Sequence, residues 1–174
     1  MPPTEKNIET SKKGQYRIKD NFLAFWFRFV YPMRSFIESD HPEIAMTKLK
    51  TGFIPNHVGY VYEDICRQKM WELNAQGKLP FLFDRVGRWW GGKDTEIDIV
   101  AIDTTDRSKI IFGECKFHQN VPMQLSELHQ LKEKAAVVPW GNANRDEYFA
   151  LFCISGYSED LQQLAQEDSH LLLM

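Results

Sequence analysis

The segment that most constrains the fold is IIFGECKF at residues 110–117, an apolar run that contains two charged side chains. An apolar run this short, bounded by polar residues, is typical of a strand in the interior of a sheet. Side chains two apart on a strand share a face, so Glu114 and Lys116 point to one side while Cys115 points to the other. Buried charges are costly unless a partner neutralises them. This strand therefore predicts a polar site within an apolar sheet.

The periodicity along the chain predicts an α/β fold with a mixed sheet flanked by helices, preceded by a helical extension. In the extension we expect a short helix from Asp20 that ends at Pro32 and a second one at about 42–49. Further helices are expected at 57–76, from Pro122 and at 158–166, and strands at 79–90, 95–103, 110–117, 148–155 and 171–174, with a turn at Gly91 and Gly92. The order helix, strand, strand, strand, helix, strand favours a mixed sheet over a purely antiparallel one.

Composition limits the classes of protein that this chain can be. At 174 residues with 43% hydrophobic content, it can bury one good core plus an appendage. Three scattered cysteines favour neither a disulfide framework nor a zinc site, and there is no secretory leader, so we expect a cytoplasmic protein. The most lipid-like run, residues 22–31, is about half the ~20 residues that a membrane crossing needs, so no membrane association is expected. The net charge of −3 counts modestly against DNA binding.

A second strand carries the acidic residue that completes the site. If strands 95–103 and 110–117 are neighbours, Asp98, Glu114 and Lys116 can converge, and one lysine cannot neutralise two carboxylates. Mg²⁺, or Mn²⁺ in its place, is commonly held by one or two carboxylates, and the backbone carbonyl of Cys115 can add a ligand. Lys116 would then orient or deprotonate the attacking water or stabilise developing charge. A solvated cross-strand ion pair is the alternative that the residues leave open.

The order Asp98, fifteen residues, then Glu114-Cys115-Lys116 resembles the PD-(D/E)XK phosphodiesterase superfamily, the fold of restriction endonucleases. The resemblance implies a restriction-endonuclease-like fold and a Mg²⁺-dependent DNA nuclease. Glu63, on the helix before the first strand, matches an additional acidic residue that helps to bind the metal in many members. In that case Glu63, Asp98, Glu114 and Lys116 form the catalytic set.

A narrower resemblance covers nearly the whole chain. The segments YRIKDNFLAFWFRFVYP, GYVYEDICR, GRWWGGKDTEIDIVAID and FGECKF resemble the C-terminal domain, of unknown function, of archaeal-type P-loop ATPases. Residues 1–14 are polar and rich in Pro, Lys and Glu, which predicts a mobile lead-in. The resemblance implies that this lead-in is left from a winged-helix wing and is followed by a helical extension at 15–52 and a nuclease-like domain at 53–174. No G-x-x-x-x-G-K-[ST] motif is present, so an ATPase partner would act in cis from a longer chain or in trans.

Four further residues are candidates for substrate contacts. His118 continues the face of Glu114, and Arg88 lies among aromatic residues that suit phosphate and base contacts. Gln130 and Lys134 lie on the next helix, where related nucleases often place a residue that positions water or phosphate. Plain surface exposure remains the alternative for His118, Gln130 and Lys134, as core packing does for the tryptophans beside Arg88.

Two functions therefore remain open. The first is a Mg²⁺-dependent endonuclease domain attached to an ATPase. The second is a catalytically inactive module of the same fold that binds DNA or protein on behalf of an ATPase. A homodimer would fit the first, but the residues alone do not identify a two-fold surface.

Overall fold

The computed structural model describes residues 1–6, 9–91, 95–142 and 144–174. The chain divides into two compact units, one made of Met1–Gly14 with Glu63–Met174 and the other of Gln15–Tyr62. The division falls ten residues beyond the boundary predicted after residue 52, because α4 begins in one unit and continues into the other. We refer to them as the sheet unit and the helical unit.

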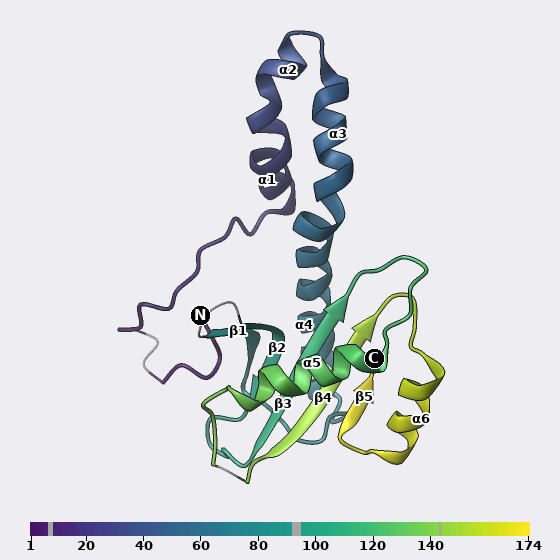
Figure 1. Cartoon of the computed structure of the whole chain (residues 1–174). Coiled ribbons are helices and arrows are strands. Elements are labelled where there is room, and N and C mark those ends of the chain that lie inside the picture. Colours follow the sequence, from purple (N-terminus) through teal and green to yellow (C-terminus); the bar gives the residue numbers. More distant parts are fainter. Residues whose placement is uncertain (7–8, 92–94, 143) are drawn as a thin grey trace. The chain divides into compact units, whose positions relative to one another are not determined.

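The sheet unit is built on one mixed sheet of five strands in the order β1-β2-β3-β4-β5 (Figure 1). The strands are β1 (Arg85–Gly91), β2 (Thr95–Ile102), β3 (Lys109–Lys116), β4 (Asp146–Cys153) and β5 (Leu171–Leu173). The first three pair antiparallel, and β4 and β5 each join in parallel. The predicted α/β class and mixed sheet are confirmed.

Helices cover both faces of this sheet. They are α4 (Gly59–Ala75), α5 (Leu125–Ala136) and α6 (Glu159–Glu167). Leu128 and Leu131 of α5 share one core with Phe112 of β3 and Leu161 of α6. On the opposite face, α4 buries Cys66 and Met70. Five consecutive residues of β3, Ile110 to Glu114, are buried, as expected for a strand that runs between two helical layers.

The strand predicted at 79–90 begins only at Arg85, which corrects that prediction. Asn74 of α4 explains the late start, since its side-chain amide donates to the Phe83 carbonyl and accepts from the Phe83 N–H, each at 3.0 Å. An amide that pairs with one residue in this way takes the place of a neighbouring strand. The predicted Gly-Gly turn includes Gly92, which lies outside the described residues.

We expect Asn74→Ala to lower the free energy of unfolding by about 2–4 kcal/mol, because it leaves two buried backbone groups of Phe83 without a partner. Urea denaturation of the purified protein measures the change. Gln76→Ala, at an exposed position just after α4, is the control and should stay within about 0.5 kcal/mol of wild type. Equal stabilities for the two variants would contradict this role of Asn74.

The N-terminal residues contact β1, contrary to the predicted mobile lead-in. Pro2 and Pro3 are buried. Arg85 donates to the carbonyls of Pro3 and Glu5, at 3.4 and 3.1 Å, and the Trp89 indole donates to the Thr4 hydroxyl. Two prolines restrict the unfolded chain, so this segment loses little entropy when it packs against a strand.

The helical unit contains α1 (Asn21–Phe25), α2 (Arg34–Glu38) and α3 (Pro42–Phe53). A π-helical and a 3₁₀-helical turn join α1 to α2, and a further π-helical turn, Ile54–Val58, follows α3. The predicted helix end at Pro32 is wrong, because Pro32 lies in the 3₁₀ turn Tyr31–Met33 and the chain stays helical to Glu38. The π-helical turn Trp26–Val30 just before it changes the hydrogen-bond spacing where proline lacks an N–H. Among the described residues, no helix is long and apolar enough to span a membrane.

Candidate functional site

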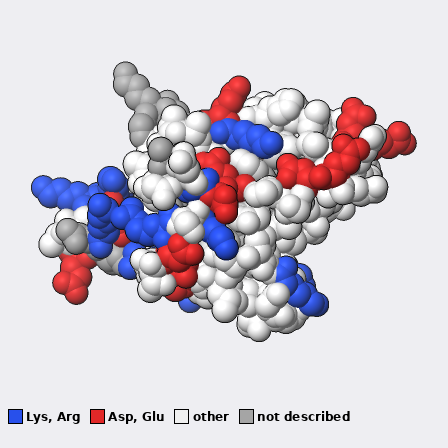
Figure 2. All heavy atoms as spheres, turned by 90° about the horizontal axis from the view of Figure 1, so that it is seen from below, with Lys and Arg blue, Asp and Glu red and all other residues white. Residues whose placement is uncertain are grey.

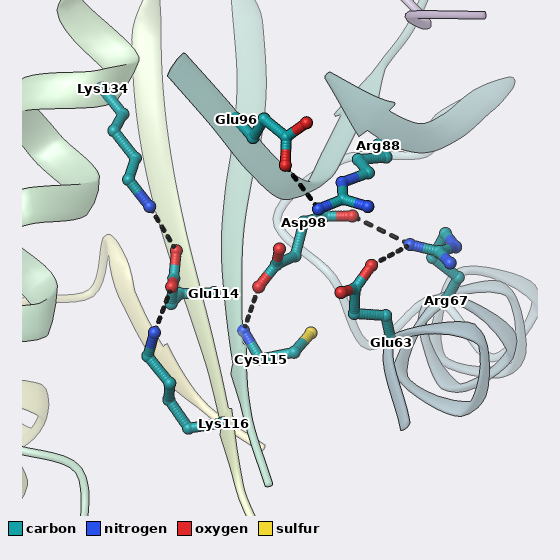
Figure 3. Close-up of polar contacts among 9 residues, drawn as sticks. All are labelled: Glu63, Arg67, Arg88, Glu96, Asp98, Glu114, Cys115, Lys116 and Lys134. Atoms are coloured by element: carbon teal, nitrogen blue, oxygen red, sulfur yellow. Dashed lines mark hydrogen bonds and ion pairs between the residues drawn. The ribbon is translucent and has the colours of Figure 1, made fainter. Parts of the chain in front are cut away.

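The backbone pairing between β2 and β3 ends next to Asp98. Pairing between β2 and β3 runs from Ile102↔Ile110 to Ile99↔Gly113 and stops there. The next N–H of β3 that faces β2, that of Cys115, donates instead to the Asp98 carboxylate at 2.9 Å. A carboxylate therefore replaces a backbone partner at the point where the strands part (Figure 3).

On its other side, β2 carries a bulge at the same residue. Val100 lies opposite Gly87 and Ile97 lies opposite Trp89, so Asp98 and Ile99 together face the single residue Arg88. An extra residue reverses the alternation of side chains along a strand and re-aims them. The bulge thus brings the Asp98 side chain toward the gap between the strands.

Glu114 is the most buried carboxylate of the site, with its side chain 7% exposed. It lies on the α5 face of β3, where Lys116 Nζ is 2.7 Å from Oε1 and Lys134 Nζ of α5 is 3.1 Å from Oε2 (Figure 3). The predicted common face of Glu114 and Lys116 is confirmed by this contact. Two ammonium groups offset the charge of this one carboxylate, which lowers the free-energy cost of burying it.

Glu63 approaches from α4, on the opposite face. Its carboxylate is 3.5 Å from Arg67 Nη1, one helical turn further along. The same Arg67 nitrogen donates to the Asp98 carbonyl at 3.0 Å, while the other terminal nitrogen pairs with Asp64. Arg67 therefore joins the helix that carries Glu63 to the bulge that carries Asp98.

The charge of Glu114 affects the pKa of Asp98, and the charge of Asp98 affects the pKa of Glu63. Burial, and next the charge of Asp98, raise the pKa of Glu63 to about 7, against the opposing charges of Arg88 and Arg67. Burial and the charge of Glu114 likewise raise the pKa of Asp98, although the Cys115 N–H and nearby cations oppose the shift. Glu63, Asp98 and Glu114 thus form one row of mutually repelling groups.

Two neighbouring groups are fixed in their protonated forms. Burial alone would lower the pKa of Lys116, but the charges of Glu114 and Asp98 outweigh it, so the net shift is upward. The Cys66 thiol and burial raise the pKa of the Cys115 thiol. Lys116 is therefore a cation at neutral pH, and Cys115 is not a thiolate nucleophile.

The other predicted contacts fall into two groups. Lys134 reaches Glu114, and Arg88, whose charge lowers the pKa of both Asp98 and Glu63, pairs with Glu96 at 2.6 Å. His118 and Gln130 are exposed, the first beyond the end of β3 and the second on α5. The structure thus brings Lys134 and Arg88 to the carboxylates, and it leaves His118 and Gln130 at the surface.

The donor set suits a hard divalent cation, because carboxylate oxygens are the ligands that Mg²⁺ prefers. Burial, and next the charge of a neighbouring carboxylate, raise the pKa values of Glu63 and Asp98, and a bound cation would offset that repulsion. Within the described residues, however, no three His, Cys, Asp or Glu side chains already form a group that could hold a metal. Glu114 faces its two lysines, and Asp98 is engaged by the β3 backbone.

Arg67 was missed by sequence reasoning as a member of the site. Its spacing of four residues from Glu63 was visible and is typical of a helix ion pair. Its second contact, with the carbonyl of Asp98, joins positions 31 residues apart. No local pattern predicts that contact.

Comparison with known proteins finds one family. The model of DUF234, described as archaea bacterial proteins of unknown function, matches residues 26–135, a range that includes all the acidic and basic residues of the site. Uncharacterized protein MJECL04 of Methanocaldococcus jannaschii is 35% identical over 142 residues, which cover 81% of this chain and 31% of that protein. The chain thus spans less than a third of the length of that relative. No solved structure matches it.

Proposed function

From the premise that this chain belongs to DUF234, the family of archaeal and bacterial proteins of unknown function, we propose that its sheet unit is a Mg²⁺-dependent phosphodiesterase acting on DNA. The observation that carries the proposal is the row Glu63, Asp98 and Glu114, contributed by a helix and two adjacent strands, with Lys116 beside it. Its spacing is the one that resembles PD-(D/E)XK nucleases, whose fold would be restriction-endonuclease-like.

Each residue has a role in this proposal. Asp98 and Glu114 are the metal ligands, with Glu63 as an outer ligand and the Cys115 carbonyl as a further oxygen. When bound, the metal ion would polarise the scissile phosphate and lower the pKa of a water molecule. Lys116 is held protonated by Glu114 and Asp98, so it steadies the attacking water or the developing negative charge and does not act as a base.

In this proposal the DNA phosphates are contacted by a few basic side chains at the site. Figure 2 shows a face of the molecule on which Lys and Arg side chains lie next to Asp and Glu side chains. In this proposal phosphate binding rests on the cations beside the carboxylates, Lys116, Lys134 and Arg88. Binding through few charges should depend only weakly on salt concentration.

A second function is favoured by the pairing of Glu114. Its two carboxylate oxygens are each taken by a lysine, and no three potential ligands are gathered within the described residues. This arrangement suits a module that has kept the fold without catalysis and binds DNA or protein. In both cases an ATPase module, in cis or in trans, is the partner that the resemblance implies.

We expect the protein to nick supercoiled or branched DNA with Mg²⁺ or Mn²⁺ and to be inactive with EDTA. Lys116→Ala should lower the rate by at least ~100-fold, because it removes the only proposed cation beside the attacking water. The measurement is the initial rate of nicking on agarose gels.

Lys69→Ala is the matched control, since Lys69 lies on α4 with a side chain 52% exposed and pairs only with the nearby Glu72 among the contacts described. Nicking at the same rate in Lys116→Ala and wild type would exclude this site as its source. Calorimetric titration with Mn²⁺ separates the two functions. The enzyme should bind Mn²⁺ with a measurable heat that Asp98→Asn abolishes, whereas the inactive module does not require metal binding.

A further inference from the structure

The first helical arm, residues 21–38, is apolar on two sides. One side is covered within the helical unit, where Phe25 and Phe29 lie against Phe53 and His57. The ring centroids of Phe25 and Phe53 are 5.9 Å apart with an edge-to-face geometry, and those of Phe53 and His57 are stacked at 5.4 Å. We call these four rings the inner cluster. It accounts for the packing of the first arm against the second arm, residues 42–58.

The other side carries a stripe of large side chains exposed to solvent. The exposed fractions are 66% for Phe22, 40% for Trp26, 51% for Phe27 and 56% for Tyr31. Phe22 and Trp26 pair at 6.2 Å, and Phe27 and Tyr31 pair at 5.8 Å, each one helical turn apart. A helix with two apolar sides is typical of a position between two other elements. We call these four residues the outer stripe.

A hollow adjoins the outer stripe toward the end of the arm. It has a volume of about 450 Å³ and is lined by Trp26, Val30, Tyr31, Arg34, Ile37 and Glu38. The two charged residues pair with each other at 2.5 Å, so the hollow has no net charge. A hollow of this size and character accepts an apolar ring from a partner.

The helical unit does not bury this surface by itself. None of residues 15–62 is buried, whereas the sheet unit has an extensive core. Two helices share only one line of contact, and here that line is the inner cluster. A second pair of helices, laid against the outer stripe, would give the four-helix arrangement that buries both sides.

We propose that the outer stripe is a two-fold interface, covered by the outer stripe of a second copy of this chain. The protruding rings Phe22 and Phe27 lie in the first half of the arm, and the hollow lies mainly in the second half. In an antiparallel two-fold arrangement the rings of each copy meet the hollow of the other, as an isologous contact requires.

The area available agrees with a stable dimer. The outer stripe with Leu23, Phe36 and Ile37 exposes on the order of 700 Å² per copy, from exposed fractions of 39–66% and the size of such side chains. A standard interface buries about 800 Å² per partner. The neutral hollow adds no repulsion between identical surfaces.

Light scattering coupled to gel filtration tests the proposal on the full chain. We expect wild type to have twice the mass of the 20.4 kDa chain, and Phe27→Glu to dissociate with an affinity at least ~30-fold weaker. Ile65→Glu is the matched control, because Ile65 is a 54% exposed apolar residue of α4 outside the stripe, and it should remain a dimer. Circular dichroism and thermal unfolding confirm that the variants are folded.

Mixing two variants tests the antiparallel geometry. Phe27→Glu and Tyr31→Lys should each be monomeric alone and should form a heterodimer when mixed. In the heterodimer the new glutamate of one copy meets the new lysine of the other, and the native Tyr31 and Phe27 meet at the second contact. A monomeric wild type across the accessible concentrations overturns the proposal, as does a dimer that Phe27→Glu leaves intact. Failure of the mixture to associate overturns the antiparallel geometry.

Discussion

The double variant Lys116→Met/Lys134→Met should be less stable than wild type by about 3–5 kcal/mol, the cost of leaving a buried charge without its partners. Glu114 has a side chain 7% exposed, and these two lysines are the cations at its oxygens. Methionine keeps most of each apolar stem, so the loss measures the missing charge more than missing packing. Guanidinium denaturation of wild type and variant gives the difference.

A third substitution shows whether the buried charge is the cause. Adding Glu114→Gln to the double variant should restore most of the lost stability, because a neutral amide no longer requires a cation. Lys69→Met/Lys132→Met is the control for two exposed lysines and should change stability by less than about 1 kcal/mol. A double variant as stable as wild type, or a triple variant with no recovery, would contradict the account of Glu114 given by the structure.

The shared face of Glu114 and Lys116 was predictable from the sequence because it depends only on the two-residue period of a strand. The mixed sheet was predictable for a similar reason, since the alternation of helical and strand periods along the chain separates the elements. Asp98 differs because its direction depends on a bulge opposite Arg88. A bulge reflects the register between two strands, which no pattern within either strand contains.

Contacts distant in sequence explain the other differences. Lys134 was one of several polar residues on an amphipathic helix, and only the docking of α5 on the sheet selects it for Glu114. The contacts of Pro3 and Thr4 with β1 cross more than 80 residues of sequence, so a polar, proline-rich segment was predicted to be mobile. The rule that a proline ends a helix failed at Pro32, because the preceding π-helical turn changes the hydrogen-bond spacing at the residue that lacks an N–H.

The stability of the metal-free protein should fall as pH rises through the window set by Glu63. Its pKa is raised from 4.5 to about 7 in the folded state, so between these values the folded protein binds more protons than the unfolded chain. Stability then decreases with pH, by about 3 kcal/mol in total for this group. The favourable contribution is complete below pH 4.5 and is lost as pH passes about 7.

Glu63→Gln should remove this slope, because the amide stays neutral at every pH. The measurement is the free energy of unfolding of both proteins in EDTA from pH 5 to 8, with Glu72→Gln, an exposed residue of the same helix, as the control. Parallel curves for wild type and Glu63→Gln would contradict the raised pKa of Glu63, which burial and next the charge of Asp98 produce. If the carboxylates bind a divalent cation, Mn²⁺ should raise the stability of wild type more at pH 8 than at pH 5, because the cation offsets the repulsion only when the groups are ionised.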